Sequence, residues 1–328
     1  MKKRYKILMA VITAYILFSI YVYYAYKSST RDWRTEIPAE AEINWADFIW
    51  HSQTINDKYF EKTAMFIPAK MEGIENILTF QFDIGSHFST IYENPLTSFY
   101  FQNEQLSEQV SQRKFPINKF ASNKKVFKDA KIQFGEYTIF NDQAFVMTNF
   151  GRAKSKERVN SKDTILVGTI GADIFMGKVL IIDYPNQKFA IAHEVPEKYK
   201  EGLIDIELDN GGHPILPLKM NSKEYKITFD NGSSLFPIIA TSENIDKFST
   251  NPIIDSLEVN SWGKKHTVHS RLITDTFEIA GRKFTNVEAY ENHTGYGIDE
   301  SVDGMTGNAL FWNSTIIIDF KNKKFGLK

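Results

Sequence analysis

Two stretches of this 328-residue chain repeat each other. GTIGADIFMGKVLIIDYPNQKFAI, residues 168–191, aligns without gaps on GMTGNALFWNSTIIIDFKNKKFGL, residues 304–327. Nine of the 24 aligned positions are identical, namely Gly168/Gly304, Gly171/Gly307, Phe175/Phe311, Ile181/Ile317, Ile182/Ile318, Asp183/Asp319, Asn186/Asn322, Lys188/Lys324 and Phe189/Phe325. Composition alone would give about one or two identities over this length, so the chain contains two related halves.

A second matching pair of segments lies upstream of the two copies. ILTFQFDIGSHFSTI ends at Ile91, EYKITFDNGSSLFPI ends at Ile238, and both place Asp-x-Gly-Ser directly after an apolar run. Each half therefore runs strand, Asp-x-Gly-Ser turn, further strands, Gly-x-x-Gly and a closing hairpin. We expect an N-terminal lobe over residues 43–195 and a C-terminal lobe over residues 203–328, joined by the polar stretch HEVPEKYKEG.

The rest of the pattern is typical of strands. Segments such as TAMFIPAKM, YKITFD and TIIIDF are short, rich in Ile, Phe, Thr and Tyr, and bounded by Gly, Asn, Asp or Lys. No convincing long amphipathic helix accompanies them. An aromatic content of 14% suits a well-packed β-rich globule rather than a disordered chain. The sequence predicts an all-β fold with an internal pseudo-twofold repeat.

At these residues the chain resembles the pepsin-like and retropepsin-like aspartic proteases. In the two-lobed members of that family, each lobe contributes an Asp-Thr/Ser-Gly turn and a downstream apolar-apolar-Gly segment. The likeness covers nearly all of the chain beyond the N-terminal region. It implies a bilobal, pepsin-like acid protease fold, a peptide or protein substrate, and no cofactor or metal.

The resemblance also assigns roles to the two turns. Asp83 and Asp230 correspond to the catalytic carboxylates, which activate a water molecule for attack on a peptide carbonyl. Two carboxyl groups about 3 Å apart share one proton, so that one acts as base and the other as acid. Gly85, Ser86, Gly232 and Ser233 form the turns that support this pair, with glycine allowing a close approach of the two loops.

Two departures from the family pattern leave a second interpretation open. The family has a hydroxyl residue after each Asp, whereas this chain has Ile84 and Asn231. The family's substrate-covering hairpin should fall between about Phe101 and Phe127, but no convincing Tyr-Gly pattern occurs there. The chain is therefore an active endopeptidase or an inactive protein of the same fold that binds a peptide, glycan or protein partner in the interlobe cleft. A transport or envelope-assembly accessory that shares only the fold is a third possibility.

The N-terminus predicts a single membrane anchor. Residues 1–6 are a basic tail, and residues 7–26 form an uncharged stretch of about 20 residues, enough to cross a hydrocarbon core of about 30 Å. The position of the basic cluster places the tail in the cytoplasm and the main domain outside, in the periplasm or at the cell surface. Residues 27–42 read as a stalk. The alternative is a cleaved signal peptide, although no Ala-x-Ala-like cleavage site is seen.

Composition excludes several other classes. A formal net charge of -1 provides no excess of Lys and Arg for binding nucleic acid. The absence of cysteine excludes disulfides, thiolate metal sites and a Cys nucleophile, and an exported protein without disulfides looks bacterial. Asp183 and Asp319 precede Asn-containing turns and are interpreted as turn residues. His266 and His269 should lie on opposite faces of a strand, which argues against a metal pair. The sequence does not predict the oligomeric state.

Overall fold

The computed structural model describes residues 12–13, 15–19, 33–39, 43–113, 124–161, 163–295 and 297–328. Within these residues the protein is mostly strand, which confirms the predicted all-β class. Three short α-helices and several 3-10 turns lie between the strands. The helices are α2 (Glu93–Thr97), α3 (Gln105–Gln109) and α4 (Lys156–Asn160).

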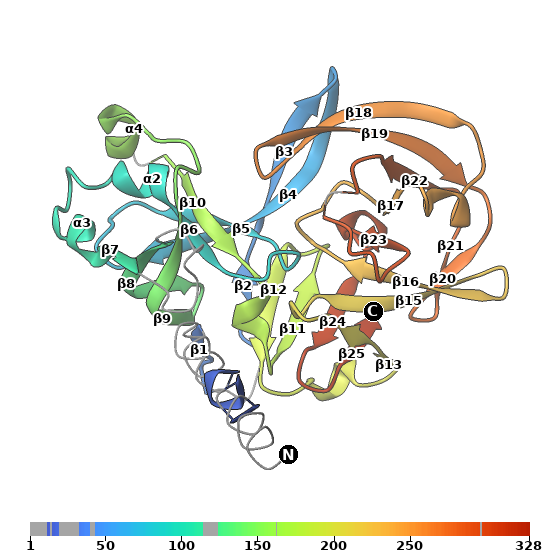
Figure 1. Cartoon of the computed structure of the whole chain (residues 1–328), viewed down its shortest axis with the longest axis horizontal. Helices are drawn as coiled ribbons and strands as arrows, with labels where there is room; N and C mark the ends of the chain where they lie inside the picture. Colours follow the sequence, from blue (N-terminus) through green and yellow to red (C-terminus); the bar gives the residue numbers. More distant parts are fainter. Residues whose placement is uncertain are drawn as a thin grey trace, which may run out of the picture.

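One large sheet is built from the first part of the described chain (Figure 1). Its order is β1 (Arg34–Glu36), β9 (Tyr137–Met147), β6 (Thr90–Tyr92), β10 (Ile165–Ile170), β5 (Leu78–Phe82), β4 (Lys58–Met71), β8 (Lys124–Phe134) and β7 (Val110–Arg113), with β3 (Ile49–Ile55) paired to β4. We call it the first sheet.

A second large sheet is built from the last part of the chain. Its order is β18 (Ile253–Ser261), β19 (Lys264–Ile273), β22 (Val287–Asn292), β17 (Ile238–Thr241), β23 (Gly304–Thr306), β16 (Lys223–Phe229), β15 (Pro214–Met220), β20 (Phe277–Ile279) and β21 (Arg282–Phe284), with β14 (Glu207–Leu208) paired to β15. We call it the second sheet.

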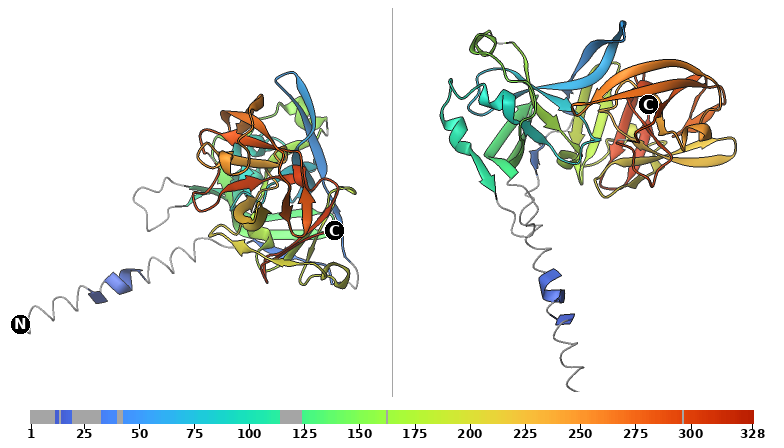
Figure 2. Two further views of the ribbon diagram at one scale, coloured as in Figure 1. Left: turned by 90° about the vertical axis from the view of Figure 1, so that its right-hand side faces the viewer. Right: turned by 45° about the horizontal axis from the view of Figure 1, so that its top comes forward.

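A smaller sheet lies between the two large ones and joins the halves (Figures 1 and 2). Its order is β13 (Ile204–Asp205), β25 (Lys324–Leu327), β24 (Thr315–Asp319), β11 (Val179–Asp183), β12 (Lys188–Ala192) and β2 (Ala46–Asp47). At its centre β11 pairs antiparallel with β24, and Ile181 lies directly opposite Ile317. These two residues are equivalent positions of the sequence repeat. Their pairing agrees with the predicted twofold relation, since a residue that pairs with its own counterpart lies beside the twofold axis.

Burial explains the strand pattern. In β4, Met65, Ile67, Ala69 and Met71 are buried and alternate with more exposed residues, which is the period of a strand with one face on a core. In β11 and β24 the Ile residues are buried without alternation, because these strands are covered on both faces. One hydrophobic cluster extends from the first sheet through the small sheet into the second.

The N-terminal region shows one difference from the predicted organisation. Arg34–Glu36 forms β1 and pairs with β9, although these residues fall in the predicted stalk. The reason is Trp33, whose large apolar side chain is buried in the main core. The predicted anchor, residues 7–26, lies mainly outside the described residues, of which 12–13 and 15–19 are helical. No helix within the described residues combines the length and apolarity needed to cross a bilayer, and the anchor stays a prediction.

Candidate active site

Asp83 and Asp230 occupy equivalent positions at the ends of two equivalent strands. Asp83 follows β5, and its N–H donates to the carbonyl oxygen of Ile170 (3.0 Å). Asp230 follows β16, and its N–H donates to the carbonyl oxygen of Thr306 (2.9 Å). In both halves the acceptor strand runs parallel to the strand that carries the Asp. The sequence repeat is therefore also a repeat of the local backbone around the two carboxylates.

Gly85 and Gly232 let the two loops approach each other. A Cβ atom added at Gly85 would lie 2.2 Å from Cγ of Asp230, and one added at Gly232 would lie 2.3 Å from Oδ1 of Asp83. Distances this short exclude any side chain at either position. Each glycine thus contacts the carboxyl group of the other half, and the structure brings the two predicted carboxylates together as a hydrogen-bonded pair.

The two carboxyl groups have different environments. Burial raises the pKa of Asp83 well above its usual range, and the negative charge of Asp230 raises it further. Burial also raises the pKa of Asp230. Opposing this rise, the N–H of Gly232 donates to Oδ1 of Asp230 (2.8 Å), and the electrostatic interaction with His213 lowers the pKa of Asp230. The shared proton is therefore held on Asp83, with the negative charge on Asp230.

Ile84 and Asn231 directly follow the two Asp residues, and they link the loops through a single side-chain hydrogen bond. The N–H of Ile84 donates to Oδ1 of Asn231 (2.6 Å), so the Asn side chain supplies an acceptor where the family has a hydroxyl. Asn308 holds the Asn231 segment by donating to its carbonyl oxygen (2.7 Å), and the hydroxyl of Tyr184 donates to Oδ1 of Asn308 (2.5 Å). The fully buried side chain of Ile84 provides no reciprocal acceptor.

The two serines of the turns act mainly through their backbone. The N–H of Ser86 donates to the carbonyl oxygen of Asp83, and that of Ser233 to the carbonyl oxygen of Asp230, each at 3.1 Å. These bonds close the two turns in the same way. The hydroxyl of Ser86 donates to the carbonyl oxygen of Phe88 (3.0 Å) rather than to the carboxylate.

The carboxyl pair lines a cleft of about 1070 Å³. Two hairpins, β3–β4 and β18–β19, contribute much of the remaining lining. Both turn through two residues with positive φ, Asn56 and Asp57 in the first and Trp262 and Gly263 in the second. Such turns match the twist of the flanking strands and allow long, continuous hairpins. Figure 1 shows β3–β4 rising between the two large sheets, with β18–β19 extending toward it from the second sheet.

The two hairpins contact each other. Lys58 and Asp255 form an ion pair between them, and Oδ1 of Asn56 accepts a hydrogen bond from the N–H of Glu258 (3.1 Å). The substrate-covering hairpin was predicted between Phe101 and Phe127, and this stays a prediction. The part of that segment that the structure describes contributes nothing to the cleft, and residues 114–123 lie outside the described residues. Within the described chain, the hairpins that line the cleft are β3–β4 and β18–β19.

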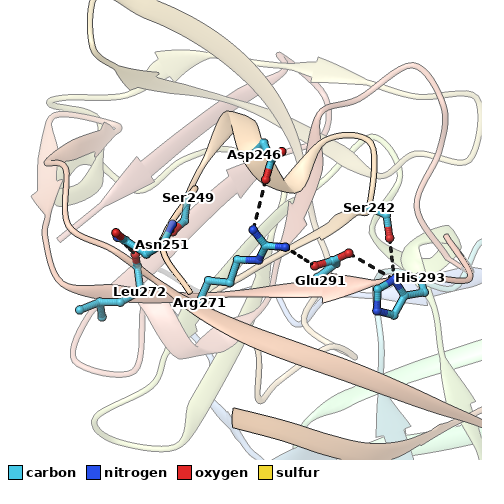
Figure 3. Close-up of polar contacts among 8 residues, drawn as sticks. All are labelled: Ser242, Asp246, Ser249, Asn251, Arg271, Leu272, Glu291 and His293. Atoms are coloured by element: carbon cyan, nitrogen blue, oxygen red, sulfur yellow. Dashed lines mark hydrogen bonds and ion pairs between the residues drawn. The ribbon is translucent and has the colours of Figure 1, made fainter. Parts of the chain in front are cut away.

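A network of ionic and polar contacts fixes the end of β19 (Figure 3). Arg271 forms ion pairs with Asp246 (3.2 Å) and with the buried carboxylate of Glu291 (2.8 Å). Nδ1 of His293 lies 3.2 Å from Oε1 of Glu291 and 2.7 Å from Oγ of Ser242. These contacts tie β19 to β22 and to the segment that follows β17. The β18–β19 hairpin is thereby anchored at its base while its turn lines the cleft.

Tyr92 was missed by the sequence analysis although it lines the cleft. It lies at the end of β6, hydrogen-bonded to the hydroxyl of Thr169, and burial raises its pKa to about 12. The repeat offered a signal for it. Continued by one residue, the alignment of the Asp-x-Gly-Ser segments pairs Tyr92 with Ile239, which lines the cleft as well.

The other acidic and histidine candidates form no part of the carboxyl pair, although His266 lines the cleft. Asp183 and Asp319 accept hydrogen bonds from Asn186 and Asn322, so both are turn residues as predicted. His266 and His269 contact different residues, Thr294 and Ser256. Among the described residues, no group of three His, Cys, Asp or Glu could hold a metal ion.

No family model matches the chain, and no curated protein matches it. Among solved structures it is similar to the crystal structure of aspartic proteinase from Irpex lacteus. The superposition has a TM-score of 0.46 and a sequence identity of 11%. It covers 81% of this chain and 94% of that chain.

Proposed function

We propose that this protein is an aspartic endopeptidase of the pepsin-like kind, anchored to a membrane by residues 7–26. The observation that carries the proposal is the reciprocal contact of Gly85 with Asp230 and of Gly232 with Asp83. Two buried carboxyl groups that face each other in a cleft provide the acid and the base for hydrolysis by an activated water.

The different environments of the two groups support a division of roles. Ionised Asp230 takes a proton from a water molecule bound between the carboxyl groups, and the resulting hydroxide attacks the carbonyl carbon of the scissile peptide. Asp83, which holds the shared proton, donates it to the carbonyl oxygen. The resulting gem-diol then collapses: the C–N bond breaks, the proton taken up by Asp230 passes to the leaving amine, and one hydroxyl of the gem-diol returns its proton to Asp83 as the carboxylic acid forms. Asp83 is again protonated and Asp230 is again ionised. No covalent intermediate with the protein forms.

The test is cleavage of an unbiased peptide library by the full-length protein between about pH 3 and about pH 7, a range in which such carboxyl pairs titrate. We expect Asp83→Asn and Asp230→Asn each to lower kcat/KM by about 100-fold or more, because each removes one half of the acid–base pair. Asp183→Asn is the matched control, since Asp183 belongs to a repeated motif but lies in a turn. Its activity should equal that of the wild type.

A second candidate function is favoured by Ile84. Because its side chain offers no acceptor, the loops are tied by one side-chain hydrogen bond rather than a reciprocal pair. A carboxyl pair held less firmly loses preorganisation. The second candidate function is therefore that of an inactive protein that binds a peptide, glycan or protein partner in the cleft. If folded wild-type protein cleaves no library peptide at any pH, the endopeptidase proposal fails and the binding function replaces it.

A further inference from the structure

The cleft carries cations that have no partner within the described protein. Arg152, Lys154 and Lys265 all line it. None of the three side chains forms an ion pair with a carboxylate among the described residues. Three unpaired cations in one cleft therefore leave a positive potential to be satisfied by whatever occupies it.

These cations lie around one aromatic contact. Phe150 and Trp262 meet with their ring centroids 5.8 Å apart, and both line the cleft. Arg152 and Lys154 follow Phe150 in the loop after β9, and Lys265 follows Trp262 at the start of β19. The contact therefore brings the three residues to the same end of the cleft, from two segments far apart in sequence. We call this group the basic end.

The cleft has few acidic groups. Besides the carboxyl pair, Glu258 is the one carboxylate among the described residues of the lining. Its N–H is bonded to Asn56 at the turn of β3–β4. Its side chain lies on the same face of the β18–β19 hairpin as Lys265, because Lys265 pairs with Asn260, two residues from Glu258, although no ion pair joins the two. The carboxyl pair itself shares a proton and carries about one negative charge. Three cations against this one further carboxylate leave the basic end with an excess of positive charge.

We propose that the basic end is a subsite for carboxylate side chains, and that the protein acts on peptides bearing Glu or Asp a few residues to one side of the scissile bond. This inference rests on the proposed function. Opposite charges across a partly desolvated cleft speed association and select the partner, while like charges exclude the wrong one. Phe150 and Trp262 supply an apolar surface against which the stem of the acidic side chain lies.

The experiment compares peptides that differ only in charge. One fluorogenic peptide found in the library is made with Glu, Gln or Lys at three positions on the N-terminal side of the cleaved bond, and a second set varies the C-terminal side. We expect kcat/KM for Glu to exceed that for Gln by about tenfold on one side only. The advantage should shrink to about twofold in 0.5 M salt, because salt screens such charges.

Two triple variants locate the effect. Arg152→Gln/Lys154→Gln/Lys265→Gln should bring the Glu-to-Gln ratio close to one. The control, Lys70→Gln/Lys188→Gln/Lys219→Gln, changes net charge equally at exposed positions outside the cleft and should leave the ratio unchanged. Two results would overturn the inference. One is a Glu-to-Gln ratio of kcat/KM near one in the wild type, and the other is a ratio that stays well above one in the Arg152→Gln/Lys154→Gln/Lys265→Gln variant.

A binding measurement separates this inference from the proposed function. The fluorescence anisotropy of labelled Glu and Gln peptides measures their binding to the full-length Asp83→Asn variant, and this measurement requires no cleavage. Tighter binding of the Glu peptide that is lost in the first triple variant supports the subsite even if the wild type cleaves nothing. Equal binding of both peptides rejects the subsite even if the wild type is an active endopeptidase.

Discussion

The N–H of Ile84 donates a hydrogen bond of 2.6 Å to Oδ1 of Asn231, between two loops that are 147 residues apart in sequence. Both residues are fully buried and directly follow the facing carboxylates. The amide oxygen of Asn231 is a hydrogen-bond acceptor, so it satisfies the buried backbone N–H of Ile84. The bond therefore links the two loops at the point where their separation sets the geometry of the carboxyl pair.

Removing the acceptor should reduce both stability and activity. In Asn231→Leu, which keeps the branched outline of the side chain but is larger, the buried N–H of Ile84 loses its partner, at a cost of about 1–3 kcal/mol in the free energy of unfolding. The carboxyl groups also lose a positioning contact, so kcat should fall by about tenfold or more. Denaturant unfolding and peptide cleavage measure the two effects. Asn231→Thr retains an acceptor oxygen and should recover most of both, whereas equal losses in the two variants would show that the bond is unimportant.

The glycine contacts give a second prediction. In Gly85→Ala the new Cβ would lie 2.2 Å from Cγ of Asp230, so the loops must separate. A displacement near 1 Å costs about 100-fold in rate when two groups act together, and we expect kcat to fall at least that far. Gly281→Ala is the control, because its Cβ meets no atom within 4 Å and its φ of +78° imposes only backbone strain. That variant should lose about 1 kcal/mol of stability and no activity. Normal cleavage by Gly85→Ala would contradict the proposed geometry.

The parts of the fold predicted from the sequence are those that the repeat encodes. The all-β class and the approach of Asp83 to Asp230 follow from matched segments, because equivalent strands carry equivalent turns to a common axis. The two hairpins that line the cleft, β3–β4 and β18–β19, were not predicted. Their turns, Asn56-Asp57 and Trp262-Gly263, lie outside the repeat, and their exposed strands carry a weak apolar pattern.

Other features could not be predicted because they depend on contacts between distant residues. Trp33 lies in a polar stretch that reads as a stalk, and only its burial shows that the chain there joins the first sheet. His213 belongs to no motif, yet its electrostatic interaction with Asp230 lowers the pKa of that carboxyl group.

Asp173 gives a prediction about pH and stability. Burial raises its pKa from 3.8 to about 6, against hydrogen bonds from the N–H (2.9 Å) and hydroxyl (2.6 Å) of Ser89. Because the folded state holds this proton more tightly than the unfolded state, the stability contribution is fully present below about pH 4 and is lost as pH rises through about 6.

Asp173→Asn removes that titration while keeping the shape of the protonated acid. The variant and the wild type should be equally stable at pH 4, and the variant should be more stable by about 1–3 kcal/mol at pH 7. Denaturant unfolding at a series of pH values measures the difference, in which titrations common to both proteins cancel. Asp47→Asn, at an exposed position in β2, is the control and should follow the wild type. A difference between Asp173→Asn and the wild type that does not change with pH would exclude this titration.

The ion pair of Arg271 with Glu291 at the base of the β18–β19 hairpin is the basis of the last prediction. Burial raises the pKa of Glu291, but hydrogen bonds from Ser242 and Arg271 outweigh burial, so its pKa lies below the usual range. A carboxyl group with a lowered pKa contributes stability above its unfolded pKa and loses that contribution as pH falls through the folded value.

Arg271→Met keeps the aliphatic stem but leaves the buried carboxylate of Glu291 without its ion pair. We expect a loss of about 3 kcal/mol at pH 7 and a smaller loss at pH 3, where Glu291 becomes protonated and no longer needs the cation. Arg34→Met is the matched control, because Arg34 pairs with Asp142 at an exposed site (2.8 Å) and should lose less than about 1 kcal/mol. Denaturant unfolding of both variants at pH 7 and pH 3 measures these losses in the free energy of unfolding. An equal loss for Arg271→Met at pH 7 and pH 3 would show that its packing, and not its charge, holds the base of the hairpin.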